Sequence, residues 1–484
     1  MKHICLFFSL VLLVGCSKST KKENEGQQPN IIFILADDLG YGDLGCYGQK
    51  IIPTPHLDRL AAEGMLFTDF YAGNTVCAPS RASLMTGKHP GHVSVRGNQP
   101  KPQLLKDEEV TLAEALSGYH SGVIGKWGVG TPQPPTDPAR NGFSYAFGYP
   151  DMVHAHNFYP EFLVQNGERI TLAGNRARRD IDWSQHYYKA QPLGGGVAAE
   201  KVTYAVDEFD REALDFLERN QDTSFFLYLA LNTPHANNEA GRYEGDGMEV
   251  QTALVEDERV YQYGAFAGKD WPDPEKGFAT MVANLDNTVN RLREKLQQLN
   301  LADNTYIFFT SDNGPHQEGE HKVDFFDSNG PLRGRKRDLY EGGIRVPLLV
   351  VGPDVAPGQV SEPFAFWDVL PTFCEIADRP VPKGIDGVSF YPSLTGRAEE
   401  QEQHTSIYFE FYEQGGKQSV RRGKWKLVKL NLRNEAPVIT ELYDLEKDLG
   451  ETTDLAEQHP KIVKELEAIL REEHEPVSRI SLFN

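Results

Sequence analysis

Cysteine is scarce in this chain of 484 residues, which contains only Cys5, Cys16, Cys46, Cys77 and Cys374. A disulfide scaffold needs paired cysteines. If the first two belong to an export segment, three remain, which is an odd number. The sequence therefore excludes a disulfide-rich fold and leaves at least one thiol that needs another explanation.

Basic charge is also in short supply. Lys and Arg number 49 against 70 Asp and Glu, which gives a formal net charge of −21 at pH 7. Sequence-independent binding to nucleic acid depends on cationic contacts to phosphate, so the composition argues against a nucleic-acid partner. An anionic substrate stays compatible with this charge if basic residues gather locally.

Long apolar runs are absent beyond the N-terminus. The run from Ile4 to Val14 follows Lys2 and His3; it is too short to span a bilayer and is typical of an export signal. It ends in LVGC at Cys16, which resembles a bacterial lipobox; a plain cleaved signal with a chance cysteine is the alternative.

The lipobox interpretation predicts an exported lipoprotein of a bacterial envelope, facing the periplasm or the cell surface. Residues 1–16 would be the signal, with Cys16 lipidated as the first mature residue and anchored in the membrane. The charged and polar residues 17–28 would form a tether.

Apolar segments separated by helical patterns predict an α/β fold. Continuous apolar runs suit parallel strands that are covered on both faces; they lie at 31–35, 122–124, 225–231, 306–310 and 347–351. Apolar residues spaced by three and four between 281 and 299 predict a helix, and residues 55–63 predict another that is closed by Gly64. Strands alternating with helices indicate a doubly wound, mainly parallel sheet in a large α/β/α sandwich.

The character of the sequence changes after about residue 352. Residues 406–411 and 424–430 alternate like antiparallel strands, and residues 462–470 carry the pattern of a terminal helix. We expect a catalytic domain over 29–355 and a smaller C-terminal α+β subdomain with an antiparallel sheet over 356–484.

Polar side chains follow the predicted strands. Asp37 and Asp38 come after the first strand, and Asp312 and Asn313 come after the fourth. Either pair alone could be a turn, because Asp and Asn bond to their own backbone. Together at one edge of a sheet they favour a hard cation such as calcium or magnesium, which prefers oxygen ligands.

Cys77 opens a short predicted helix that Gly87 would close. It could be a buried structural thiol, a thiolate whose pKa is lowered by the helix N-terminus, or a residue destined for modification. Arg81 would stand near the helix start, where free N–H groups favour an anion.

The segment CAPSR at 77–81, followed by LMTG at 84–87, resembles the signature of the type I, formylglycine-dependent sulfatases, which are arylsulfatase-like enzymes of the alkaline-phosphatase-like superfamily. Further motifs resemble this family in the same order and cover nearly all of the mature chain: NIIFILADDLGYG at 30–42, GKW at 125–127, TSDNG at 310–314, GRKRDLYEGGIRVP at 334–347 and ELYDLEKDLGETTDL at 441–455.

The resemblance implies that a sulfatase-maturating enzyme oxidises Cys77 to formylglycine (3-oxoalanine) before or during export, and that the hydrated aldehyde attacks sulfur. It also implies one Ca²⁺ ion, held by Asp37, Asp38, Cys77, Asp312 and Asn313. The further catalytic residues by motif position would be Arg81, Lys126, His235 and Lys336, the last two nearest the leaving oxygen. The implied activity is the hydrolysis of a sulfuric ester on a sulfated sugar, as in a bacterial carbohydrate sulfatase.

One residue departs from the family pattern: Gly128 stands where the family usually has a histidine after Gly-Lys-Trp. Another base must then take the proton, and we expect His154, His156, His316 or a water molecule. The three histidines, together with Arg335 in the basic run at 333–337, are also expected to bind the sugar, although isolated loop histidines and charge runs are commonly ordinary surface features.

Two alternatives stay open on the sequence alone. A phosphatase or phosphodiesterase of the same superfamily is disfavoured by a cysteine at the nucleophile position and by all-oxygen metal ligands. A catalytically impaired glycan-binding homologue has the missing histidine at 128 as its sole support.

Overall fold

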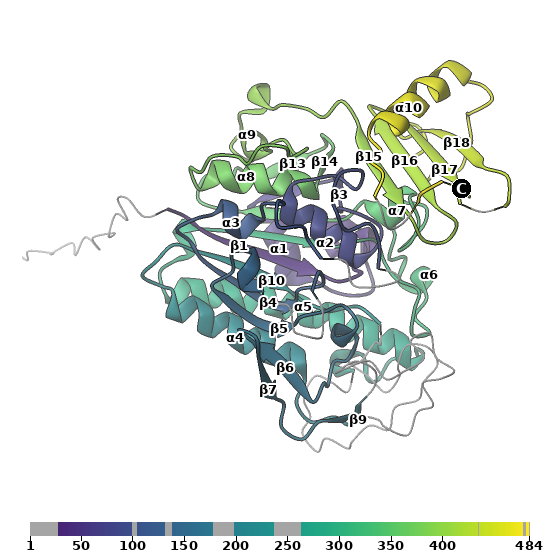
Figure 1. The fold of residues 1–484 in the computed structure, drawn as a ribbon. Helices are drawn as coiled ribbons and strands as arrows, with labels where there is room; N and C mark the ends of the chain where they lie inside the picture. The colour runs from purple at the N-terminus through teal and green to yellow at the C-terminus, as the bar shows by residue number, and fades with distance from the viewer. Residues whose placement is uncertain are drawn as a thin grey trace, which may run out of the picture.

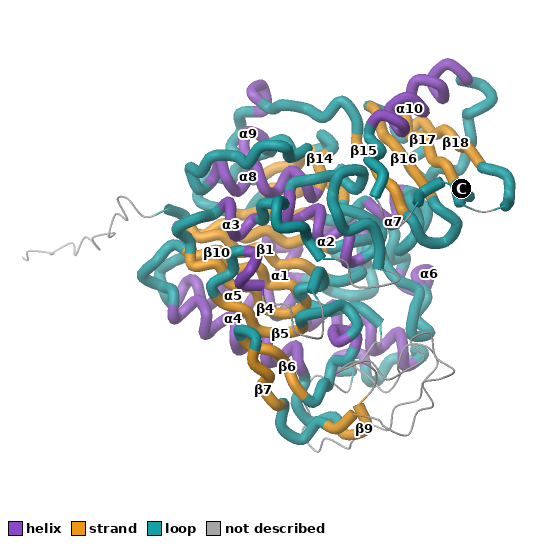
Figure 2. The backbone as a smooth tube through the Cα atoms, viewed as in Figure 1, coloured by secondary structure: helices purple, strands orange, loops and turns teal. Residues whose placement is uncertain are grey.

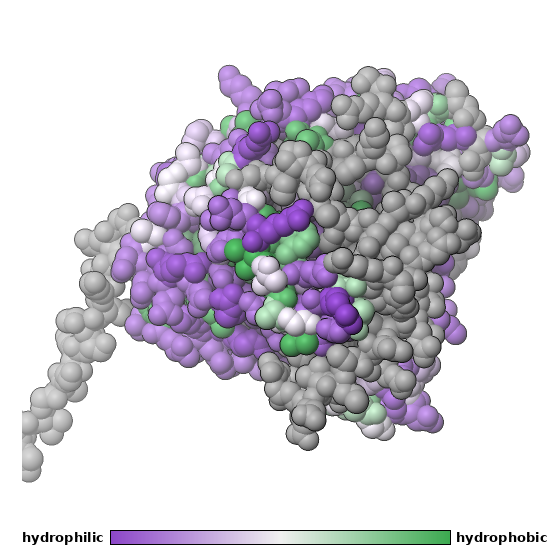
Figure 3. Space-filling model, turned by 60° about the horizontal axis from the view of Figure 1, so that its bottom comes forward, coloured by the Kyte–Doolittle hydropathy of each residue, from purple (hydrophilic) through white to green (hydrophobic). Residues whose placement is uncertain are grey.

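The computed structural model describes residues 28–98, 104–130, 138–177, 198–236, 263–433, 435–477 and 481–483. The predicted signal, the lipobox at Cys16 and the tether up to residue 27 lie outside these residues. None of the described helices combines the length and the apolar character needed to cross a membrane. The face drawn in Figure 3 is mainly hydrophilic in its described part, with a few apolar side chains near the centre, as expected for a chain in which 25% of residues are charged.

A ten-stranded sheet runs through the larger part of the molecule (Figures 1 and 2). Its strands, in spatial order, are β13 (Gly358–Val360), β2 (Met65–Phe67), β12 (Leu348–Val351), β11 (Thr305–Ser311), β1 (Asn30–Ala36), β10 (Phe225–Ala230), β4 (His120–Lys126), β5 (Tyr145–Tyr149), β6 (Phe162–Gln165) and β7 (Glu168–Thr171). The central run from β11 to β5 is parallel throughout. The predicted mainly parallel sheet is therefore confirmed.

Strand β1 shows why the sheet is covered on both faces. Ile31, Phe33 and Leu35 point into one apolar core, and Ile32 and Ile34 point into the other. The first core contains residues of helices α2 (Cys77–Thr86), α3 (Leu112–Ala115), α8 (Val369–Ile376) and α9 (Tyr391–Leu394), and the second contains residues of α1 (Pro55–Glu63), α4 (Ala205–Arg219), α5 (Asp273–Gln298) and α6 (Val323–Phe326). Figure 1 shows the two helical layers on opposite sides of the sheet.

One local expectation needs correction: the segment 347–351 forms strand β12, but this strand runs antiparallel to both of its neighbours, β11 and β2. The predicted helix over 55–63 is confirmed as α1, and Gly64 ends it in an extended conformation. A Cβ atom at Gly64 would lie 2.1 Å from the carbonyl oxygen of Val350, so close packing against β12 is what requires glycine there.

A separate antiparallel sheet consists of β15 (Ile407–Phe411), β16 (Lys417–Arg422), β17 (Trp425–Leu430) and β18 (Ile439–Asp444). Helix α10 (Pro460–Glu472) covers one face through Leu466 and Leu470, which pack with Tyr408 and Leu427. The predicted antiparallel sheet and terminal helix are confirmed, whereas β16, which lies between the two predicted strands, was not anticipated.

The large layer extends beyond residue 355, the predicted end of the catalytic domain. Strand β13 pairs with β2, β14 (Phe364–Ala365) pairs with β3 (Phe70–Tyr71), and α8 packs on the first core. A further short pair joins β8 (Arg176–Ala177) to β9 (Ala198–Glu200). By packing, the smaller unit begins at β15 rather than at residue 356.

Buried ion pairs join the small sheet to the large layer, and we call this group the interlayer network: Asp69, Tyr71, Glu341, Arg345, Arg421, Lys426 and Glu451. Glu341 opens the short helix α7 (Glu341–Ile344), and Lys426 Nζ lies 2.8 Å from Glu341 Oε1 and 2.9 Å from Glu451 Oε1. Because each charge faces an opposite one, the network fixes the position of the small sheet.

Candidate active site

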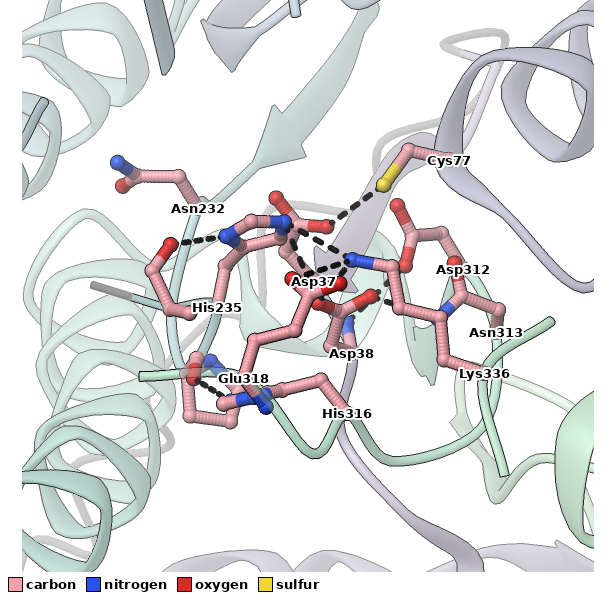
Figure 4. A network of polar contacts seen from close by, with 12 residues as sticks. Asp37, Asp38, Cys77, Asn232, His235, Asp312, Asn313, His316, Glu318 and Lys336 are labelled. Carbon is pink, nitrogen blue, oxygen red and sulfur yellow. Dashed lines mark hydrogen bonds and ion pairs between the residues drawn. The ribbon is translucent and has the colours of Figure 1, made fainter. Parts of the chain in front are cut away.

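The carboxyl ends of four neighbouring strands meet at one edge of the sheet. The register aligns Ala36 with Ser311 and Ala230 with Gly125, so the residues that follow β1, β11, β10 and β4 come together. The N-terminus of helix α2 lies at the same edge, with Cys77 Sγ 3.3 Å from Asp37 Oδ1 (Figure 4). The sequence prediction that these strand ends share one site is thus realised in the geometry.

Three buried aspartates form the centre of the site, and a cation contacts one oxygen of each. Lys126 Nζ lies 2.6 Å from Asp37 Oδ2, and Lys336 Nζ lies 2.8 Å from Asp38 Oδ2. The guanidinium of Arg81 donates to Asp312 Oδ2 through Nε at 2.9 Å and Nη2 at 2.8 Å. These ion pairs fix the orientation of every carboxylate.

The crowding of carboxylates suits a cation. Burial, followed by the nearby charge of Asp37, raises the pKa of Asp312 to about 7. Asn313 donates to Asp38 Oδ1 at 2.7 Å, while its own amide oxygen is buried without a hydrogen-bond donor. Converging carboxylates with an unpartnered amide oxygen match the donor set that Ca²⁺ prefers.

Cys77 is 1% exposed, at the first position of α2. Burial, and then the charge of Asp37, raises the pKa of the thiol well above its usual value, which argues against the thiolate alternative. The helix has no capping side chain of its own at Val76; instead, Asn98 accepts a hydrogen bond from the N–H of Ala78 at 3.1 Å. The predicted helix end at Gly87 is confirmed, with φ +65°.

Arg81 also explains the glycine at 128. Its Nη1 donates to the carbonyl oxygen of Lys126 at 2.6 Å, so the side chain is held at both Asp312 and β4. Gly128 has φ +82°, and a Cβ atom there would lie 2.8 Å from Arg81 Cδ. A histidine at this position would need a left-handed backbone and a displaced Arg81.

His235 and Lys336 form a pair beside Asp38. Lys336 Nζ donates to His235 Nε2 at 3.1 Å, so the other ring nitrogen carries the proton and donates to the carbonyl oxygen of Ala236. Burial, followed by the charge of Lys336, holds the pKa of His235 well below its usual value, so the imidazole is neutral. A ring nitrogen of His235 and Cys77 Sγ lie within 4.8 Å of each other.

Known proteins show the same sequence pattern and fold. Residues 29–378 match the Sulfatase family, and residues 332–476 match the family described as N-sulphoglucosamine sulphohydrolase, C-terminal. The chain is 30% identical to an N-acetylgalactosamine-6-O-sulfatase of Bacteroides thetaiotaomicron, over 95% of this chain and 96% of that protein.

The chain belongs to the sulfatase family.

Human arylsulfatase A is 32% identical to this sulfatase over 88% of the chain and 83% of the relative. The crystal structure of Ps i-CgsB in complex with k-i-k-neocarrahexaose has a TM-score of 0.74 at 27% identity and covers 93% of this chain and 94% of that one. The predicted family, fold and enzyme class are therefore confirmed, and the protein is a sulfuric ester hydrolase.

Two of the predicted sugar-binding histidines have structural roles in this sulfatase. His154 is 1% exposed and packs against Tyr149 and Phe162, and burial lowers its pKa to about 3. His316 is fully buried; its Nε2 bonds to the carbonyl oxygen of Pro234 at 2.9 Å, and its Nδ1 accepts from the N–H of Glu318 at 3.1 Å. Packing holds His154 and hydrogen bonds hold His316, and contact of either side chain with a sugar stays a prediction.

His156 and Arg335 lie differently. The ring of His156 stacks on that of His235, with centroids 4.3 Å apart, so His156 lies next to the site. Arg335 is exposed, and its backbone N–H donates to Asp338. Two of the three histidines considered as a substitute base therefore lie against His235, with ring centroids 4.3 Å away for His156 and 6.1 Å away for His316. A water molecule is the other candidate.

The basic residues at 333–337 have different roles in the structure. Arg333 lies over the ring of Tyr340, 3.9 Å from its centroid, and therefore serves packing. Lys336 points into the site, while Arg337 pairs with Glu318. Sequence reasoning missed Glu318 because nothing in its loop distinguishes it from the exposed Glu320 nearby.

Proposed function

We propose that this sulfatase removes sulfate from a galactose-type sugar of a sulfated glycan, with the 6-O-sulfate of N-acetylgalactosamine as the first substrate to test. The observation that carries the proposal is the convergence of Arg81, Lys126 and Lys336 around Cys77 in an otherwise acidic protein. The name of the Bacteroides thetaiotaomicron relative supports the choice of sugar.

Calcium and formylglycine are part of this proposal. Asp37, Asp38, Asp312, Asn313 and residue 77 would hold the ion, and their buried oxygens fit it as described above. When bound, Ca²⁺ would supply positive charge next to the sulfate, and formylglycine at position 77 would supply the attacking hydroxyl.

The protein's own cations would bind and orient the sulfate group. Lys126 lies beside residue 77 and Asp37, and Arg81 is fixed by three hydrogen bonds, so neither needs to reorganise when an anion arrives. Lys336 carries its proton, because the charges of Asp38 and Glu318 outweigh burial and raise its pKa. With neutral His235 at 3.1 Å, Lys336 is placed to protonate the leaving sugar oxygen.

The alternatives gain little support. Family membership favours a sulfatase over a phosphatase or phosphodiesterase. The only support for a glycan-binding protein without activity is the glycine at position 128. Arg81 packs against Gly128 where a histidine side chain would begin, and it still donates to Asp312.

The cellular context is proposed from the sequence. Residues 1–16 would direct export, Cys16 would carry the lipid, and a maturating enzyme would act on Cys77 before the chain folds, since the thiol is buried afterwards. Replacing Cys16 by Ser should release the protein from the membrane fraction. Retention of this variant in the membrane would contradict the anchor.

Two measurements test the central claim. Protein produced with a maturating enzyme should show, by mass spectrometry, an aldehyde in place of the thiol in the peptide that carries residue 77. It should release sulfate from sulfated mono- and disaccharides, whereas Cys77→Ala should release none. A peptide that carries only thiol, or turnover of phosphate esters alone, would overturn the proposal.

A further inference from the structure

Glu318 lies at the open side of the site, and none of the motifs described above includes it. It belongs to the loop between β11 and α6, and its carboxylate contacts Lys336 Nζ at 3.4 Å (Figure 4). The carboxylate also accepts a hydrogen bond from Arg337 Nη1. Its side chain is 26% exposed, whereas those of Asp38 and Lys336 are 0% and 3% exposed. Glu318 therefore forms part of the boundary between the buried site and the solvent.

The contacts of Lys336 show from which side a substrate reaches this lysine. Its ammonium group donates to Asp38 at 2.8 Å and to His235 at 3.1 Å, and both of these side chains are buried. The contact with Glu318 is the longest of the three and involves the most exposed partner. Of the three partners of Lys336, Glu318 is therefore the one nearest to solvent, and a sugar that presents its ester oxygen to Lys336 from this side lies next to the Glu318 carboxylate.

The charge of Glu318 limits what can lie beside it. Burial would raise its pKa, but the cations around it, Lys336 first, hold the pKa well below the usual value. An ionised carboxylate only accepts hydrogen bonds, so it can bind a hydroxyl group, whereas a second sulfate there would meet repulsion.

We propose that Glu318 accepts a hydrogen bond from the sugar hydroxyl nearest to the sulfate ester, which is O4 when the sulfate is on O6 of a galactose-type sugar, and that it thereby selects sugars in which this hydroxyl is not sulfated. The proposal rests on the proposed function, which places the leaving oxygen beside Lys336. O4 and C6 of a galactose-type sugar lie on the same face of the ring, and Lys336 Nζ and Glu318 Oε2 are 3.4 Å apart. Lys336 and Glu318 can thus contact O6 and O4 of one sugar.

The test compares three substrates: the monosulfated sugar that the wild type hydrolyses best, its counterpart lacking the neighbouring hydroxyl, and its counterpart with a second sulfate at that position. Glu318→Ala removes the acceptor, and Glu318→Gln removes only the charge. Glu320→Gln is the matched control, because Glu320 is an exposed carboxylate of the same loop. The readout is kcat/KM for sulfate release, with thermal unfolding to confirm that each variant folds.

For the wild type and Glu320→Gln, we expect the deoxy sugar to react at least about tenfold more slowly, because it lacks the hydroxyl that donates to the charged carboxylate. The disulfated sugar should react more slowly still, because its second sulfate meets the charge of Glu318. For Glu318→Ala, kcat/KM on the hydroxyl and deoxy sugars should agree within about twofold. If the carboxylate and the hydroxyl interact, removing one of them removes the effect of the other. Glu318→Gln should raise the relative rate on the disulfated sugar by about tenfold or more.

Other outcomes identify which idea fails. If both Glu318 variants lower kcat/KM by the same factor on all three substrates, Glu318 merely holds Arg337 and Lys336 in place, and the inference is overturned. A wild type that hydrolyses no sulfated sugar would instead overturn the proposed function, and the role of Glu318 with it.

Discussion

The active site and the interlayer network are both clusters of buried charge, yet they are built for different ends. In the interlayer network, Lys426 separates Glu341 from Glu451, and Arg345 lies between Glu341 and Asp69. In the active site, three aspartates converge beside Cys77 and the buried amide oxygen of Asn313, which accepts no hydrogen bond. Burial and a neighbouring carboxylate raise the pKa of one acid in each cluster to about 7, Glu451 in the interlayer network and Asp312 in the active site. The two clusters therefore differ in the thiol and the unpartnered amide oxygen of the active site, and not in the titration of their acids.

The largest effect on activity is expected for Asp312→Asn. The change removes a proposed calcium ligand and should lower sulfate release at least about a hundredfold. The change also removes the charge that faces the buried guanidinium of Arg81, so the calcium-free variant should unfold at a lower temperature than the wild type. Sulfate-release kinetics and thermal unfolding without calcium check both parts. Retained activity in the folded variant would show that Asp312 serves only the fold.

The matched change in the interlayer network is Lys426→Met, which removes the cation between Glu341 and Glu451 and leaves Glu341 paired with Arg345 alone. We expect a loss of about 3 kcal/mol in the free energy of unfolding, as for other broken buried ion pairs. Activity of the folded variant should stay within about twofold of the wild type, because no Lys426 contact reaches the site. Urea denaturation measures the loss, with Lys426→Arg as the charge-preserving control. If Lys426→Met were stable but inactive, the interlayer network would serve activity rather than stability, and the contrast with the active site would be wrong.

Gly128→His sharpens the comparison inside the active site. The backbone at residue 128 must keep φ +82° with a side chain attached, and the new imidazole must displace Arg81, whose guanidinium orients Asp312. Left-handed backbone strain costs about 1–3 kcal/mol, so we expect lower stability together with about tenfold lower activity. Gly128→Ala carries the strain without the imidazole and serves as the control. A gain in activity with His but not with Ala would show that the site can use the usual family histidine.

Sequence reasoning placed several candidate site residues at one edge of the sheet because they follow recognisable strands. Each of them lies within four residues of the end of an apolar run, and parallel strand ends share an edge: Asp37, Lys126, His235 and Asp312. The direction of β12 was not accessible, because an apolar run does not reveal which neighbour it pairs with or in which sense.

The elements that sequence reasoning missed are polar ones whose burial depends on distant partners. Strand β16 reads KQSVRR and shows no apolar alternation; Gln418 is buried because it bonds to Tyr408, and Arg421 is held by Asp69 and Tyr71. The burial of His154 and His316 likewise depends on loops that fold back onto the sheet. Composition favours the surface for such residues, so only the folded chain reveals their position.

The smallest effect is expected for a half-exposed ion pair outside both networks. His92 Nδ1 lies 2.9 Å from Asp386 Oδ1, and the hydrogen bond to Asp386 raises the pKa of His92; Glu473 and Glu475 add to this shift. A histidine whose pKa is higher in the folded than in the unfolded state stabilises the fold fully below about pH 6.5, and this contribution is lost as the pH rises through the folded value. His92→Gln should therefore lower stability by less than about 1 kcal/mol at pH 6 and hardly at all at pH 9, since 26% of the side chain is exposed to solvent. Thermal unfolding of both proteins between pH 6 and pH 9 gives this difference directly. A gap that widened with rising pH would mean that His92 contributes through its neutral form, by packing on His89 at a centroid distance of 4.0 Å.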